Sequence, residues 1–174
     1  MSTPLSSSIN VVVRHKARLV HVYGPGDIEV MFDDRAMVPS LHLKTIRLQT
    51  VDLDDGFFRT LNFDFPVLEH LELEYCNVYG QNVSSRSLKS IRISCCHLHG
   101  DLQICVPNLN HLFILYPKFE KGSVIITREL YSLVTASVSL RSRVYGNRDK
   151  IVNASILEGL SHVTALELHA PSLR

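Results

Sequence analysis

An apolar pattern that returns at nearly regular intervals constrains this chain more than any other feature. The segment 68–78 aligns with the segment 88–98 at every apolar position, 20 residues apart. Both segments read apolar-x-x-apolar-x-apolar-x-x-Cys-x-apolar, and Gly80 and Gly100 close the two units at the same place. A chain that repeats itself in this way is expected to fold as a stack of similar units.

The same frame recurs along most of the chain. Its copies, two of them weaker, begin at positions 17, 43, 68, 88, 109, 133 and 163, so the intervals are 26, 25, 20, 21, 24 and 30 residues. Leucine-rich repeats run about 20–29 residues. Apolar-x-apolar alternation is typical of a strand with one buried face, and a single unit cannot bury that face alone. The sequence therefore predicts an α/β leucine-rich-repeat solenoid with a curved parallel β-sheet and mostly loops and short helices on the convex side.

The frame also predicts where the elements lie. The clearest strands are expected at Lys44–Leu48, Glu69–Leu73, Lys89–Ile93, Asn110–Ile114 and Thr164–Leu168. The acidic pair Asp54-Asp55 is expected to start or cap a short helical turn. A helix is expected from Ile151 to Ser161, with Asn153 as its N-cap. The returns at 80–87 and 100–106 are too short for full helices.

The length of 174 residues predicts one domain. We expect a flexible N-terminal segment at 1–12 and a repeat domain of about six to seven units at 13–174. Solenoids need end units with a polar outer face. Here the chain stops one residue after the last frame position, Leu173. The domain is therefore expected to be incomplete at one or both ends.

Charge indicates which classes of partner to expect, and the cysteines indicate the cellular compartment. The chain has 18 basic and 17 acidic residues, a net charge of +1, so neither nucleic acid nor a membrane surface is expected as a partner. No apolar stretch approaches the roughly 18 residues of a membrane helix, and no secretory signal precedes the repeats. A cytoplasmic or nuclear location with free thiols is expected. Cys76 and Cys96 share a register, so they are expected to be buried, reduced neighbours.

Motifs for chemistry are missing. The segment Cys95-Cys96-His97-Leu98-His99 invites a metal interpretation, but zinc sites usually separate their cysteines by two to four residues and need four ligands. The frame turns Cys96 and Leu98 inward, which favours structural roles. The chain contains no His-Glu-x-x-His, Gly-x-Ser-x-Gly, Walker or Gly-x-Gly-x-x-Gly motif. No enzymatic activity, metal or cofactor is expected.

The residues between the frame positions project from the exposed face of the predicted sheet. One column across successive strands contains Arg47, Glu72 and Arg92, so Glu72 is expected to be the shared partner of two guanidinium groups. Aromatic and Arg side chains dominate protein-binding hot spots. The candidate binding residues on this concave face are Arg47, His70, Glu72, Arg92, His111, Phe113, Leu115 and Tyr116.

Four segments carry a resemblance to a known family. They read FPVLEHLELEYC at 65–76, VPNLNHL at 106–112, LYSLVTASV at 130–138 and ILEGLSHV at 156–163. In sequence and in order they resemble the repeat region of plant F-box/leucine-rich-repeat proteins of the FBD-like family, over roughly residues 17–173. In that family the repeats select a substrate, and an N-terminal F-box recruits the Skp-type adaptor of a cullin–RING ubiquitin ligase.

The resemblance implies a protein-interaction module for substrate recognition. Nothing between Met1 and Leu43 resembles the opening F-box motif LPDxLLxxILS. A Skp-type adaptor is therefore expected as a partner only if a missing N-terminal region supplies an F-box. The alternative is a stand-alone leucine-rich-repeat scaffold or interaction protein that is unrelated to ubiquitination.

Overall fold

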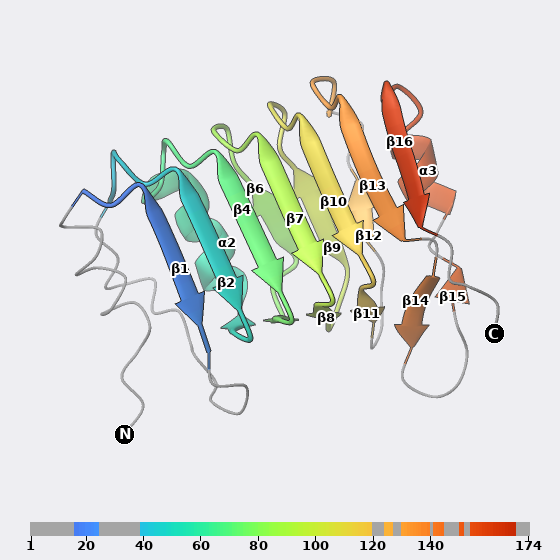
Figure 1. The fold of residues 1–174 in the computed structure, drawn as a ribbon, viewed down its shortest axis with the longest axis horizontal. Coiled ribbons are helices and arrows are strands. Elements are labelled where there is room, and N and C mark those ends of the chain that lie inside the picture. Colours follow the sequence, from blue (N-terminus) through green and yellow to red (C-terminus); the bar gives the residue numbers. More distant parts are fainter. Residues whose placement is uncertain are drawn as a thin grey trace.

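A parallel sheet of seven strands is the main element of the fold (Figure 1). The computed structural model describes residues 16–24, 39–119, 124–126, 130–139, 141–144, 150–151 and 154–169. The strand order is β1-β2-β4-β7-β10-β13-β16, so each strand pairs with the strand of the next unit along the chain. The bounds are β1 Leu19–Tyr23, β2 Thr45–Gln49, β4 His70–Glu74, β7 Ser90–Ser94, β10 His111–Leu115, β13 Thr135–Ser139 and β16 Ala165–His169. The predicted α/β repeat solenoid is confirmed, and the two weaker copies supply β1 and β13.

The five strands predicted most clearly all begin and end one residue later than the frame indicates. The backbone explains the shift. The amides of Lys44 and Thr45 both donate to the carbonyl of Arg18, at 2.9 and 3.0 Å, and the amides of Glu69 and His70 both donate to that of Lys44, at 2.9 Å. The residue before each strand thus shares a carbonyl with the first strand residue, and the regular ladder starts after it.

The segments that return the chain contain short strands where loops were expected. Three of them, β6 Asn82–Ser84, β9 Leu102–Cys105 and β12 Val124–Ile126, form a second parallel sheet. A third sheet has the order β15-β14-β11-β8-β5-β3. Its strands are β3 Asp52–Leu53, β5 Asn77–Val78, β8 His97–Leu98, β11 Lys118–Phe119, β14 Arg141–Val144 and β15 Lys150–Ile151. The returns at 80–87 and 100–106 contain no helix, as predicted. Their backbone groups find partners in strand pairing and also in side chains, as where the amide of Arg86 donates to Asn62 Oδ1 at 3.2 Å.

One return carries a full helix, α2 Asp55–Phe63. Asp54 caps it, because its side-chain oxygen accepts a 3.1 Å hydrogen bond from the amide of Phe57. The acidic pair therefore starts a helix that is longer than the expected turn. The second helix, α3 Ala154–Gly159, is shorter than the predicted 151–161. Ile151 belongs to β15, and Asn153, the expected cap, lies outside the described residues, as does the segment 1–12.

The core runs along the inner side of the sheet. One column of it pairs Leu48 with Leu73, Leu73 with Ile93 and Ile93 with Ile114, each at most 1% exposed. At β16 the apolar residues Leu166 and Leu168 are 43% and 44% exposed. They lie on the edge strand of the sheet, and no further unit covers them among the described residues. None of the helices described is both long and apolar enough to cross a membrane.

Gly80 and Gly100 occupy the same position in neighbouring units but have different surroundings. A Cβ atom added at Gly80 would lie 2.3 Å from Cδ2 of Phe58 and 3.0 Å from the backbone oxygen of Asp54. A Cβ atom added at Gly100 would meet nothing within 4 Å. The difference arises because Phe58 of helix α2 packs against Gly80, whereas no side chain lies beside Gly100. Gly80 is therefore required by packing, whereas Gly100 is not.

We expect Gly80→Ala to lower the free energy of unfolding by about 2 kcal/mol, because overpacking a filled site costs about 1–3 kcal/mol. Gly100→Ala is the matched control and should change it by less than about 0.5 kcal/mol. Urea denaturation followed by circular dichroism measures both. Equal denaturation midpoints for the two variants would contradict the packing of α2 against Gly80.

The thiols of Cys76 and Cys96 lie in adjacent units and are fully buried and free. The Cys76 Sγ donates to the carbonyl of Leu48 at 3.3 Å. Burial raises the pKa of the Cys96 thiol, which keeps it protonated and unreactive. The predicted burial of this pair is confirmed, while Cys95 and Cys105 are partly exposed.

Native thiol labelling should therefore modify Cys95 and Cys105 first and leave Cys76 and Cys96 protected. Peptide mapping by mass spectrometry after timed labelling measures each site. In denaturant all four thiols should react alike. Labelling of either buried thiol at its unfolded rate under native conditions would be inconsistent with this packing.

Candidate functional site

We call the side of the seven-stranded sheet that points away from the core the open face. Strand alternation places every second residue on it. Arg47 lies beside Glu72, Glu72 beside Arg92 and Arg92 beside Phe113 in the strand register. The column predicted from the sequence therefore exists, and it extends across β2, β4, β7 and β10.

All eight candidate residues lie on the open face or directly at its end. Seven are strand residues, and the eighth follows β10. They are Arg47, His70, Glu72, Arg92, His111, Phe113, Leu115 and Tyr116. The stacking of units brings together side chains that are up to about 70 positions apart in the sequence, spaced by the roughly 4.8 Å between strands.

The charged column is arranged differently from the prediction. Arg47 Nε lies 3.0 Å from Glu72 Oε2, but Arg92 lies over the ring of Phe113, with its guanidinium carbon 4.3 Å from the ring centroid. Within the described part of the sheet Glu72 thus pairs with one arginine and is not shared by two. The reason is that Phe113 offers an aromatic face on the next strand, and a weakly hydrated guanidinium stacks well on such a face.

The paired side chains border a hollow of about 290 Å³ on the open face. Its lining comes from four strands, β1, β2, β4 and β7. Arg47, Glu72 and Arg92 line it, together with His21 and Tyr23, whose ring centroids are 4.1 Å apart. Glu74 also lines it, so the hollow combines two guanidinium groups, two carboxylates and an aromatic wall.

A row of tyrosines at the carboxyl ends of the strands was missed by the sequence reasoning, apart from Tyr116. Tyr75 and Tyr116 have φ angles of 53° and 50° and follow β4 and β10 at the same place in the repeat. Their side chains are 53% and 56% exposed, and Tyr23, the last residue of β1, is 65% exposed. A left-handed conformation is rare for such residues, and here the turn holds it. The signal was available, because both tyrosines come two residues after the last buried residue of a strand.

A polar cluster links β13 and β16 on the same face. Ser137 Oγ lies 2.8 Å from His169 Nε2 and donates to Glu167 Oε2 at 3.0 Å. The residue types match a hydrolase triad, but the geometry differs. In a triad the carboxylate holds the histidine nitrogen opposite the serine, whereas here Glu167 Oε2 lies 3.4 Å from the same Nε2 that contacts Ser137. The cluster is a cross-strand network at the edge of the sheet.

The Cys-His segment lies in and beside β8. Cys96 and Leu98 point inward, as predicted. The rings of His97 and His99 are tilted by 36° to each other with centroids 4.3 Å apart, and Tyr79 stacks on His99 at 4.2 Å. Among the residues that the structure describes, no three His, Cys, Asp or Glu side chains are placed to hold a metal ion.

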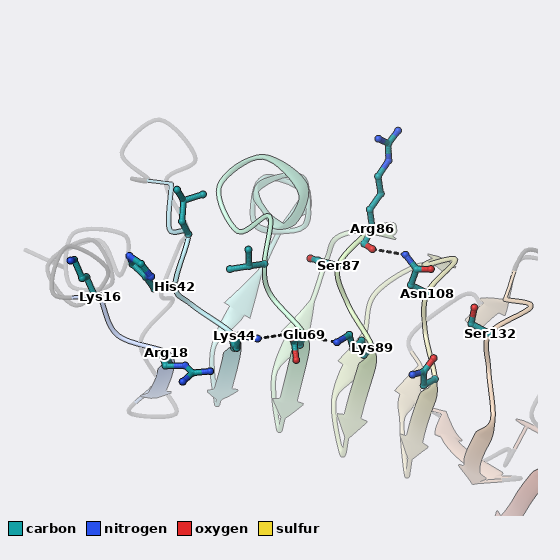
Figure 2. A pocket seen from close by; sticks show the side chains of 13 residues that line it. Lys16, Arg18, His42, Lys44, Glu69, Arg86, Ser87, Lys89, Asn108 and Ser132 are labelled. Atoms are coloured by element: carbon teal, nitrogen blue, oxygen red, sulfur yellow. Dashed lines mark hydrogen bonds and ion pairs between the residues drawn. The ribbon is translucent and has the colours of Figure 1, made fainter.

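A larger hollow, of about 770 Å³, lies at the amino-terminal ends of the strands (Figure 2). Lysine and arginine side chains from several units line it, and none of them was singled out from the sequence. Three of them, Arg18, Lys44 and Lys89, directly precede strands, a position that could have been aligned from the frame. Only the register of the strands showed that these side chains gather at the amino-terminal edge of the sheet.

We expect Glu72→Arg to lower the free energy of unfolding by about 1 kcal/mol, because it places a third guanidinium group beside Arg47 and Arg92. Glu74→Arg is the matched control, since its neighbours in the register are the uncharged Gln49 and Ser94. Urea denaturation at low and high salt measures both variants, and salt should reduce the effect at position 72. An equal loss for both variants would rule out charge repulsion in this column.

Comparisons with protein-family models, with curated proteins and with solved structures find no match to this chain.

Proposed function

We propose that this chain is a leucine-rich-repeat interaction module that binds another protein through its open face and performs no chemistry of its own. The observation that carries the proposal is Arg92 stacked on Phe113 at 4.3 Å, between the Arg47–Glu72 ion pair and the exposed Tyr116. Arginine and tyrosine are enriched at the energetic centres of protein interfaces. A cluster of this composition on an exposed sheet is suited to anchor a partner.

The rigidity of the face supports the same proposal. The candidate side chains at its centre project from β2, β4, β7 and β10, which are paired on both sides, so little conformational freedom is lost when a partner binds. Seven strands of five residues cover on the order of 30 by 16 Å of flat sheet, a narrow strip for an interface that buries roughly 800 Å² of accessible surface per partner. The partner is therefore expected to extend beyond the face onto the tyrosines at the carboxyl ends of the strands.

The finer proposal is that the bound protein is a substrate of a cullin–RING ubiquitin ligase. Its support is the resemblance of the segments 65–76, 106–112, 130–138 and 156–163 to the repeats of F-box/leucine-rich-repeat proteins. A Skp-type adaptor that co-purifies with a full-length form carrying an F-box would support it. A partner held by the open face without any ligase subunit would favour the scaffold alternative.

The test is affinity purification with a double variant and a matched control. Arg92→Ala combined with Tyr116→Ala removes the arginine and tyrosine anchors of the open face. Arg59→Ala combined with Phe63→Ala removes an exposed arginine and an exposed aromatic residue from α2, away from that face. A specific partner should be retained by the wild type and the control and lost by the open-face variant.

Titration calorimetry with the purified partner then gives the magnitude. If truncation of each hot-spot residue costs about 1.4 kcal/mol or more of binding free energy, the open-face double variant should bind the partner about 100-fold or more weakly than the wild type. The control variant should bind within about twofold of the wild type. Equal losses for both double variants would overturn the assignment of the open face.

A further inference from the structure

Two rows of side chains line the amino-terminal rim of the sheet. The inner row consists of the residues directly before successive strands, and the outer row consists of the residues two positions earlier. The inner row is Arg18, Lys44, Glu69, Lys89 and Asn110. The outer row is Lys16, His42, Val67, Ser87, Asn108 and Ser132. Both rows line the same 770 Å³ hollow, which is therefore a groove that crosses the strands (Figure 2).

A continuous backbone ladder holds the inner row in place. The amide of Glu69 donates to the carbonyl of Lys44 at 2.9 Å, the amide of Lys89 to that of Glu69 at 2.8 Å, and the amide of Asn110 to that of Lys89 at 2.8 Å. Side chains in the row are thus separated by about 4.8 Å from strand to strand. The five intervals from β1 to β13 make a groove of about 24 Å, which matches about seven residues of extended peptide at about 3.3 Å each.

The charge of the groove is strongly positive although the chain is nearly neutral. Its lining includes five cationic side chains and a single carboxylate, that of Glu69. Glu69 Oε1 lies 2.6 Å from Lys44 Nζ and 3.5 Å from Lys89 Nζ. The hydrogen bond from Lys44 holds the pKa of Glu69 below its ordinary value. This carboxylate fixes two ammonium groups side by side, and each keeps further N–H donors for a ligand.

Both lysines remain available to a ligand. Their side chains are 39% and 51% exposed for Lys44 and Lys89. At the other end of the groove the lining changes to uncharged donors and acceptors, namely Asn108, Asn110 and Ser132. Asn108 Nδ2 donates to the backbone oxygen of Arg86 at 2.8 Å, which fixes the amide at the wall of the groove. One end is thus suited to carboxylates and the other to uncharged polar groups.

We propose that this amino-terminal groove is a second binding site, separate from the open face, and that it binds an extended acidic segment of a protein. The acidic side chains of the segment pair with the lysines and arginines from β1 to β7. The remainder of the segment donates and accepts hydrogen bonds at the amide end, between β10 and β13. The occupant is thus about seven residues long, acidic over about half its length, and extended.

The lining favours a peptide over other polyanions. Single-stranded nucleic acid is usually held by aromatic side chains on which its bases stack, and the only aromatic ring in the lining described is the imidazole of His42. An anionic membrane presents a flat layer of headgroups, whereas these cations line a hollow. The amides and hydroxyls of the groove match the donors and acceptors of a peptide backbone.

The test uses the whole chain and a fluorescein-labelled peptide of about four glutamates followed by about three serines, the length of the groove. Fluorescence anisotropy at low salt measures the affinity, and a peptide with glutamine in place of each glutamate is its control. We expect Lys44→Gln and Lys89→Gln each to weaken binding about fivefold, as for the loss of one exposed ion pair. Lys118→Gln, an exposed lysine on β11, is the matched control and should leave the affinity unchanged.

Glu69→Gln separates ligand binding from a structural role. Its carboxylate competes with the peptide for both lysines, so its removal should tighten binding by about threefold or more. A merely structural role would weaken binding in this variant. Circular dichroism and urea denaturation confirm that each variant is folded.

Several outcomes would overturn the proposal. They are an affinity weaker than about 1 mM, equal binding of the glutamine peptide, equal effects of Lys44→Gln and Lys118→Gln, or weaker binding by Glu69→Gln. Stronger binding of a thymidine oligonucleotide or of phosphatidylserine vesicles would assign the groove to another polyanion. The double variant Arg92→Ala, Tyr116→Ala should bind the acidic peptide normally, so the failure of one site is distinguishable from the failure of the other.

Discussion

The structure depends on one constraint, which is that a single unit of 20–30 residues cannot cover its own apolar strand face. Leu71 and Leu73 are 1% exposed because the strands on both sides bring their own apolar residues to the same level. Where the described residues provide no further neighbour, the equivalent positions Leu166 and Leu168 are 43% and 44% exposed. Burial here is a property of the stack and not of the unit.

The same stacking organises everything that faces solvent. Once the core columns are in register, the polar residues between them form columns as well, and the residues at each end of the strands form rows. The open face, the tyrosines at the carboxyl ends and the cationic groove at the amino-terminal ends therefore all follow from the stacking of the same repeat. Each combines residues from several units, and none exists within a single unit.

Differences between the units explain where the regular pattern fails. The return that contains α2 requires a glycine at position 80, whereas the neighbouring return, which contains β6, leaves space beside Gly100. In the charged column, the residue beside Arg92 on the next strand is the aromatic Phe113, and Arg92 stacks on its ring instead of pairing with Glu72. Local composition thus decides the contacts, within positions that the repeat has already set.

The sequence by itself determined the parallel solenoid, the inward residues and the faces on which the candidate residues lie, because alternation and repeat spacing encode which side of a strand is buried. It also indicated that the pair Asp54-Asp55 starts or caps a helical turn, although the full length of α2 became visible only in the structure. It could not decide that Arg92 stacks on Phe113, or that Lys44 and Lys89 share Glu69. Those contacts depend on the register between strands and on side-chain conformations. Only the tertiary structure brings residues from different units together, and so only it revealed the groove.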